Sequence, residues 1–192
     1  MRRRRASIAI ASCFLVGACS ASTSKDAAKL DATKIPDTIT VTSPDFANNG
    51  AIPRDDTCAG PGNRPALAWR GVPADTQSIA VVVDDPDAPK GDFVHWVVIG
   101  LTPQTTTLAG IPAGAHELDN TGGTRGWTPP CPPAGSTHHY HFTVYALRTY
   151  VCASISDTAP TSDCSPPSTQ EALPQIQDAA IAKGALVGTY RR

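Results

Sequence analysis

The amino-acid sequence predicts a single, mainly β domain that carries one helix near its C-terminal end. Short apolar runs rich in β-branched residues recur along the chain and are bounded by proline or glycine, which is typical of buried strands. The 18 prolines and 15 glycines are spread between these runs, as expected for strands joined by turns. Apolar residues at helical spacing occur in one segment, which begins close to residue 170.

The predicted strands follow one another from residue 39 onward. Residues 39–42 alternate between apolar and polar side chains and begin the β structure. Three later runs are almost continuously apolar, at residues 78–83, 93–99 and 142–147. Runs of this length that are closed by proline or glycine favour strands over helices.

One helix is predicted after residue 168. Ser168 is the expected N-cap, because Glu171 three residues later would complete a capping box. The apolar residues at helical spacing are Leu173, Ile176, Ala180 and Ile181. Pro174 interrupts this pattern and is tolerated only close to the first turn. We expect the helix to end near Gly184.

The N-terminal end has the features of a secretory signal. Residues 2–5 are arginines, residues 6–16 form a short apolar run, and Val16-Gly17-Ala18-Cys19 resembles a lipobox. The apolar run is too short to span a membrane. We predict a signal peptide at residues 1–18, with cleavage before Cys19 and acylation of that cysteine. The alternative is an ordinary signal peptide that is cleaved nearby.

The predicted mature chain consists of a tether and one domain. Residues 19–37 contain the lipidated cysteine and a flexible stretch rich in small and polar residues. Residues 38–192 form the predicted domain, which is long enough to bury a core. Without the signal arginines, 12 of the 16 basic residues remain against 17 acidic ones, a net charge of about −5. This charge excludes broad binding to nucleic acid or anionic lipid, so a phosphate must be held by a local site.

Four cysteines remain once the signal and the lipidated cysteine are set aside: Cys58, Cys131, Cys152 and Cys164. An even number in an exported protein favours two disulfides, for which three pairings exist. We favour Cys152–Cys164, because this pair closes a short loop rich in Ser, Pro and Asp. A zinc site is the alternative, but no Cys-x-x-Cys spacing supports it, and we expect no metal.

Polar residues suited to holding a small anion occur at residues 84–89, 91–96 and 126–140. Each stretch lies where an apolar run meets proline or glycine, and strand ends are where a scaffold usually presents functional side chains. The stretches supply carboxylates, imidazoles and a phenol but no evident nucleophile, which suits binding better than bond cleavage.

Alternation along an extended strand divides the residues that follow Thr137. His138 and Tyr140 are expected to point one way and to offer an imidazole and a phenol to one site. His139 and His141 are expected to point the other way. They could ligate a metal with a third group, but no third ligand is evident and a solvated polar face is the simpler interpretation.

A series of short blocks runs through the chain in a recognisable order. The blocks are Ala51-Ile52-Pro53, Thr57-Cys58-Ala59-Gly60, Pro65-Ala66-Leu67-Ala68-Trp69, Asp85-Pro86-Asp87-Ala88-Pro89, His95-Trp96-Val97-Val98, Pro130-Cys131-Pro132-Pro133-Ala134-Gly135, His138-His139-Tyr140, Tyr145-Ala146-Leu147 and Leu186-Val187-Gly188-Thr189-Tyr190. Together they resemble the phosphatidylethanolamine-binding protein family, and specifically its bacterial, Raf-kinase-inhibitor-like branch. The likeness extends from about residue 39 to residue 190.

The resemblance implies a large antiparallel sheet packed on a smaller one, with a pocket at one end. It implies that Asp85, His95, His138 and Tyr140 surround this pocket and hold a phosphate or carboxylate group. Pro86 belongs to the same ligand-binding set, because it stiffens the loop that aims Asp85 inward. Hydrogen-bonding or protonated imidazoles suit such a ligand.

One residue of the expected pocket wall departs from the family pattern. The wall is formed by Trp127, Pro129 and Pro130, and relatives usually have glycine where this chain has Pro129. Proline adds a ring and removes an N–H donor, so we expect a narrower or weaker anion site. The same blocks bring Cys58 and Cys131 near the mouth of the site, which makes them the natural second disulfide pair.

The sequence therefore favours a binding protein over an enzyme. We expect a lipid-anchored protein at the outer face of a bacterial membrane that holds a small phosphorylated or carboxylated ligand, such as a phospholipid headgroup, without a cofactor. The family also includes modulators of kinases and proteases, which implies a kinase or a protease as protein partner. Two alternatives stay open: a serine-protease inhibitor, although no reactive loop is evident, and a metal-free hydrolase that uses the histidine and aspartate residues.

Overall fold

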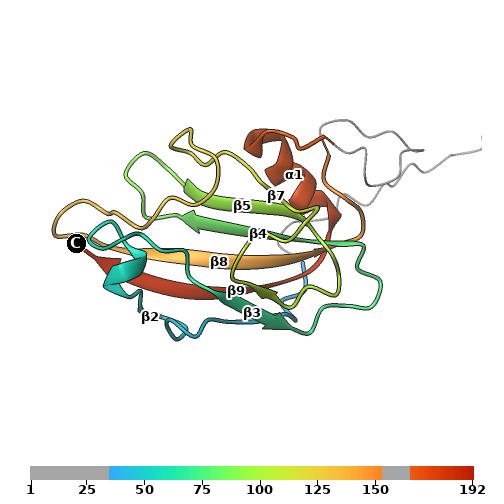
Figure 1. Ribbon diagram of the computed structural model, residues 1–192, viewed down its shortest axis with the longest axis horizontal. Coiled ribbons are helices and arrows are strands. Elements are labelled where there is room, and N and C mark those ends of the chain that lie inside the picture. Colours follow the sequence, from blue (N-terminus) through green and yellow to red (C-terminus); the bar gives the residue numbers. More distant parts are fainter. Residues whose placement is uncertain (1–34, 153–164) are drawn as a thin grey trace, which may run out of the picture.

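The computed structural model describes residues 35–152 and 165–192, which form two β-sheets and one α-helix (Figure 1). The elements are β1 (Thr40–Thr42), β2 (Gly50–Ala51), the 3-10 turn η2 (Arg54–Asp56), β3 (Leu67–Arg70), β4 (Ser78–Asp85), β5 (Phe93–Leu101), β6 (Thr107–Leu108), β7 (His116–Glu117), β8 (Thr137–Leu147), α1 (Thr169–Ala179) and β9 (Ala180–Arg191). The large sheet has the order β2-β9-β8-β4-β5-β7, and the small sheet has the order β1-β3-β6. Paired strands are antiparallel, except that β2 and β9 are parallel. The predicted mainly β fold, with two sheets and a helix close to the C-terminal end, is confirmed.

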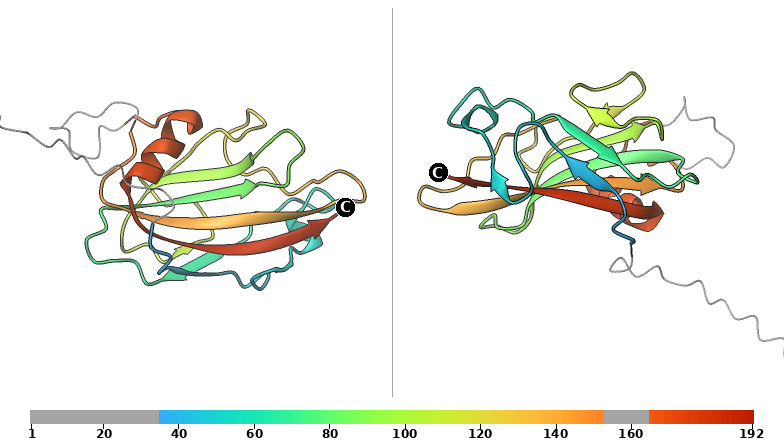
Figure 2. Two further views of the ribbon diagram at one scale, coloured as in Figure 1. Left: turned by 180° about the vertical axis from the view of Figure 1, so that it is seen from behind. Right: turned by 90° about the horizontal axis from the view of Figure 1, so that it is seen from below.

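Both faces of the large sheet are covered, which explains why its central strands are almost continuously apolar. On β4, Ile79, Val81 and Val83 point into the core between the two sheets. Ala80 and Val82 point into a second core, between the sheet and α1. Figure 2 shows the small sheet and the helix on opposite faces of the large sheet.

The helix α1 begins as predicted. The Ser168 hydroxyl accepts a hydrogen bond from the backbone N–H of Glu171, and the Glu171 carboxylate accepts one from the backbone of Ser168, which completes the capping box. Ala172, Ile176 and Ala179 recur on one face and are buried against the sheet.

The predicted helix end near Gly184 is wrong, because residues 180–184 belong to strand β9. They pair with β8, from Ala180 opposite Leu147 to Gly184 opposite Val144. The glycine is needed for a different reason. A Cβ atom at residue 184 would lie 1.7 Å from the main-chain oxygen of Ile39, so the N-terminal segment passes directly over β9 at this point.

The described part of the chain begins within the stretch that we assigned to the tether. Ile35 packs against the core beneath α1, and the backbone N–H of Lys183 donates to the carbonyl of Pro36 at 2.8 Å. The predicted signal peptide and Cys19 lie outside the described residues. Within residues 35–152 and 165–192, no helix is both long and apolar enough to cross a membrane.

Candidate ligand-binding site

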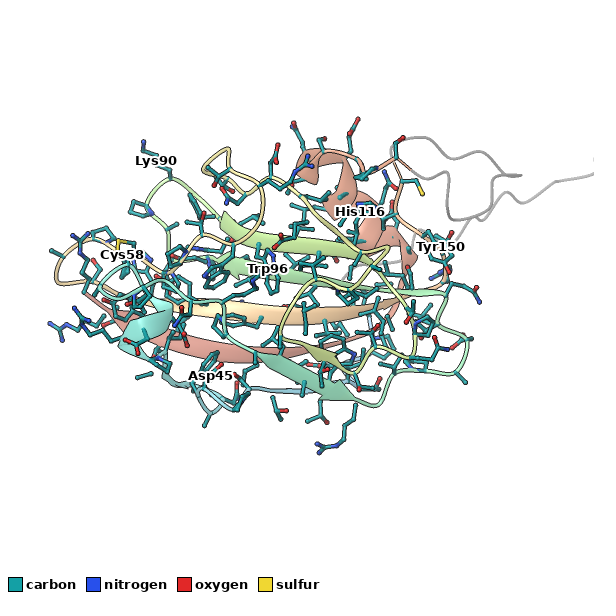
Figure 3. All side chains as sticks on the ribbon, viewed as in Figure 1. Asp45, Cys58, Lys90, Trp96, His116 and Tyr150 are labelled. Carbon is teal, nitrogen blue, oxygen red and sulfur yellow. A yellow bond between two sulfur atoms is a disulfide. The ribbon has the colours of Figure 1, made fainter. Side chains whose placement is uncertain are left out.

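Four strand ends meet at the end of the large sheet that lies away from α1 (Figure 1). β4 ends there at Asp85, β5 begins at Phe93, β8 begins at Thr137 and β9 ends at Arg191. Figure 3, drawn in the same view, labels Cys58 at this end of the molecule. The antiparallel pairing thus brings together the three polar stretches that are separated in the sequence.

Asp85 and His138 form a buried pair at the centre of this end. The Asp85 Oδ2 atom lies 2.7 Å from His138 Nδ1, and the two side chains are only 6% and 7% exposed. The other carboxylate oxygen of Asp85 accepts the backbone N–H of Asp87 at 2.9 Å. Both oxygens of Asp85 are therefore engaged in hydrogen bonds, and both Asp85 and His138 line the cavity described below.

His95 reaches the site through an irregularity of β5. Val83 pairs with Trp96, whereas the next residue of β4, Asp84, pairs with Val94, so His95 is an extra residue in the ladder. Such bulges redirect side chains next to functional sites. The ring of His95 is held by a 2.7 Å hydrogen bond between its Nδ1 atom and the carbonyl of Thr128. Burial lowers the pKa of His95, so its ring is neutral near pH 7.

The partners of the two imidazoles determine what they offer to a ligand. A carbonyl oxygen and a carboxylate can only accept, so His95 and His138 each donate from Nδ1. In a neutral ring the remaining nitrogen, Nε2, is then an acceptor. Each ring becomes a donor toward an anion only after it takes up a proton.

Tyr140 lies behind the two histidines rather than in the cavity wall. It is fully buried, its ring meets that of His95 edge-on at 5.2 Å, and it lies 6.5 Å from the ring of His138. Burial raises the pKa of the phenol, which keeps it protonated. Its hydroxyl has no hydrogen-bond partner among the described residues.

Residues 127–133 form the opposite side of the site. Trp127 faces the core, where its indole N–H donates to the carbonyl of Gly62 at 3.2 Å. The carbonyl of Pro130 accepts the backbone N–H of Cys58 at 3.0 Å, next to the Cys58–Cys131 disulfide. Trp127 and Pro130 therefore support the wall from behind, whereas Pro129 lines it.

These elements enclose a cavity of about 330 Å³. Its lining residues are Asp85, Ala88, Pro89, Phe93, His95, Thr128, Pro129, Cys131, Pro132, Pro133, His138 and Arg192. Pro129 takes its place in the wall without closing the cavity. Of the predicted ligand-binding residues, Asp85, His95 and His138 line it, while Pro86 and Tyr140 do not.

Two further Asp–His pairs lie on the other face of the β4–β8 ladder. The Nδ1 atom of the exposed His139 lies 2.7 Å from Asp87 Oδ2, and the backbone N–H of His139 donates to the same oxygen at 2.9 Å. These two hydrogen bonds lower the pKa of Asp87. His141 lies 3.7 Å from Asp84, in a second cavity of about 380 Å³ beneath α1. Across residues 35–152 and 165–192, no cluster of three or more His, Cys, Asp or Glu residues could hold a metal ion.

The cysteines divide between described and undescribed parts of the chain. Cys58 and Cys131 form a disulfide, as the resemblance implied. Cys152 is also disulfide-bonded, and its predicted partner Cys164 lies outside the described residues.

The cavity includes residues whose role the sequence did not indicate: Phe93 and Thr128 lie within the predicted stretches, and Arg192 lies outside all of them. The ring of Phe93 lies 4.7 Å from that of His95. Thr128 fixes His95 through its backbone, and no side-chain pattern indicates such a contact. Arg192 could have been found only from the register of β9 on β8, and the early residues of β9 had been assigned to the helix.

The fold and the cavity define a small two-sheet β protein with a pocket at one end of its large sheet, where a few polar side chains meet a mostly apolar wall. The chain belongs to the phosphatidylethanolamine-binding protein family, because the model of that family matches residues 42–191. It is 40% identical over 157 residues to the "Putative lipoprotein LppC" of Mycobacterium tuberculosis, covering 79% of this chain and 72% of that protein.

Two solved structures share the fold. The homologue CT736 from Chlamydia trachomatis is 31% identical and superposes with a TM-score of 0.68. YbcL of E. coli, described as a new member of the mammalian PEBP family, is 30% identical with a TM-score of 0.69. Each similarity covers 81% of this chain and 99% of the other.

Proposed function

We propose that this protein is an exported, lipid-anchored protein that binds a small ligand through a phosphate or carboxylate group. The observation that carries the proposal is the buried Asp85–His138 pair, which lines a small cavity together with His95. Buried, hydrogen-bonded titratable groups in a cavity are the usual mark of a ligand site.

The size and stiffness of the cavity favour a headgroup-sized ligand. A volume of about 330 Å³ is at the lower end of the range for small-molecule sites. The wall contains Pro129, Pro132 and Pro133, which restrict the backbone before a ligand arrives. A preorganised wall lowers the entropic cost of binding. A phosphate or a phospholipid headgroup fits this cavity better than an acyl chain does.

Proton uptake gives the site its affinity for an anion. The Nε2 atoms of His95 and His138 donate to an anion when their rings are protonated. A phosphate that carries a hydroxyl proton could instead donate to a neutral ring. The unpartnered hydroxyl of Tyr140, directly behind the histidines, provides a further donor if the site adjusts or a water enters.

The membrane anchor is the second part of the proposal. Lipidation of Cys19 would hold the domain at the membrane surface, within reach of phospholipid headgroups. A relative that carries lipoprotein in its name supports this assignment.

An NMR titration tests the proposed ligand. The full chain would be purified in a detergent without phosphate and titrated with inorganic phosphate, acetate and O-phosphorylethanolamine. We expect saturable shifts at Asp85, His95 and His138, while His139 on the opposite face stays unchanged. Absence of these shifts in a folded protein would contradict anion binding and direct attention to a protein-facing surface.

A further inference from the structure

We infer that Arg192 selects a phosphate dianion over a carboxylate at this cavity, an inference that rests on the proposed function. Arg192 lines the cavity with Asp85, His95 and His138, although it belongs to none of the sequence blocks that indicated the site. Its role follows from its position on the ladder, from the charges around the cavity and from the donors that the other side chains can offer.

The register of β9 on β8 places Arg192 on the cavity side. Tyr190 pairs with His138, and Arg191 pairs with Thr137. Directly opposite residues share a face of the sheet, so Tyr190 lies on the side of His138 and Arg191 on the other side. Two residues after Tyr190, Arg192 returns to the cavity side.

The backbone holds Arg192 in this position independently of its side chain. The main-chain oxygen of Arg192 accepts the N–H of Gly135 at 2.7 Å, and its own N–H donates to the carbonyl of Ser136 at 3.3 Å. Both contacts tie the end of β9 to the turn that leads into β8. A substitution of the exposed Arg192 side chain therefore leaves the course of the chain intact.

Among the described residues that line the cavity, Arg192 has the one side chain with a fixed positive charge. Asp85 is acidic, and His95 is neutral near pH 7 because burial lowers its pKa. In the part of the chain that the structure describes, no carboxylate lies within ion-pair distance of Arg192. Its Nη1 atom instead lies 3.7 Å from Cys131 Sγ, a weak acceptor that a ligand oxygen readily replaces.

Phosphate and carboxylate ligands differ in how much their binding depends on a guanidinium group. One protonated imidazole can neutralise the single charge of acetate. A phosphate dianion carries a second charge and additional acceptor oxygens, which match the planar, five-donor guanidinium. Because Arg192 is exposed, its contribution is moderate and decreases as salt screens the charge.

Calorimetric titration of the full chain and of Arg192→Ala, Arg192→Lys and Arg191→Ala tests the inference. Arg191 is the matched control, because it has the same charge on the neighbouring residue but lies on the opposite face. For inorganic phosphate we expect about tenfold weaker binding by Arg192→Ala and an intermediate loss by Arg192→Lys. For acetate we expect a loss below about threefold, and Arg191→Ala should match the parent with both ligands.

The outcomes separate the inference from the function on which it rests. No phosphate binding by the parent overturns both. If the parent binds phosphate but Arg192→Ala and Arg191→Ala lose the same amount of phosphate affinity, the inference alone is overturned. The same holds if Arg192→Ala loses as much affinity for acetate as for phosphate. A parallel titration with O-phosphorylethanolamine distinguishes the sources of the phosphate, because tighter binding than inorganic phosphate identifies a headgroup and weaker binding identifies free phosphate.

Discussion

Asp84 has a partly buried carboxyl group, 22% exposed, whose charge should destabilise the fold, and removing that charge should stabilise the fold. Burial, followed by the nearby charges of Asp92 and Asp85, raises the pKa of Asp84 to about 7. The single basic group in ion-pair range among the described residues is His141, at 3.7 Å. Asp84→Asn keeps the size and shape of the side chain but cannot ionise.

The raised pKa of Asp84 determines the sign and the size of the change in the free energy of unfolding. The folded protein holds the Asp84 proton more tightly than the unfolded chain, whose pKa is near 3.8. This contribution to stability is present below pH 4 and is lost as the pH rises to about 7. The difference between a pKa of about 7 in the folded protein and 3.8 in the unfolded chain corresponds to about 4 kcal/mol as an upper limit. Relaxation of the protein around the carboxylate reduces this free energy, so we expect Asp84→Asn to be more stable than the parent by about 1–4 kcal/mol at pH 8.

Urea denaturation of both proteins between pH 4 and pH 8 measures this difference. At pH 4 the protonated aspartate resembles asparagine, and the two free energies of unfolding should nearly coincide. Asp87→Asn provides a control of opposite sign, since hydrogen bonds from His139 lower the pKa of Asp87 and favour its charged form. A difference for Asp84→Asn that does not change with pH, or a less stable variant at pH 8, would refute this reasoning.

Three further predictions concern the ligand site and its wall. His138→Ala should weaken phosphate binding by about 1–3 kcal/mol in calorimetry, while His139→Ala should leave it unchanged; equal losses would contradict the assignment. Acetate, which stays ionised between pH 6 and 8, should bind more tightly as the pH falls, because the Nε2 atom of His95 must gain a proton to donate; a flat profile would count against this role. Replacing Cys58 and Cys131 together by serine should lower the free energy of unfolding by roughly 2–4 kcal/mol in urea denaturation, and unchanged stability would show that the disulfide is not needed.

The central strands of the fold could be predicted because burial on both faces leaves a strong pattern. β4 and β5 appear in the sequence as short runs of branched apolar residues, and the structure extends each run by two residues. The apolar run of β8 begins only at residue 142, whereas the strand begins at Thr137; its polar first residues were expected to be extended from the alternation of His138 and Tyr140 with His139 and His141. Because these positions are polar, the apolar pattern that indicates a strand is weaker where β8 enters the site.

β9 shows why the last strand could not be predicted from pattern alone. Its first residues, alanine and isoleucine, continue the helical spacing of α1 without a break. Two glycines, which are usually rare in strands, allow other segments to pass close to it. A Cβ atom at Gly188 would lie 2.6 Å from Ile52, just as one at Gly184 would meet Ile39. These are tertiary contacts, and neither helical spacing nor strand propensity contains them.

In the site, alternation predicted the faces but not the depth of each residue. It placed His138 and Tyr140 on one face, yet only the packing shows that Tyr140 lies behind the cavity. The bulge at His95 and the support that Trp127 gives from the core side depend on the register between strands. Register is a property of paired strands, so a single chain segment does not reveal it.

The two closest Asp–His pairs show that burial, rather than the contact itself, separates a site from a surface feature. Asp85–His138 and Asp87–His139 have the same 2.7 Å separation, and both link β8 to the end of β4 or the loop after it. The first pair is 6% and 7% exposed, whereas the side chains of His139 and Asp87 are 51% and 42% exposed. Water and salt screen the exposed pair, so a ligand gains little by approaching it. In the buried pair, Coulomb interactions are screened less, so a charge on the histidine acts more strongly on a ligand in the cavity.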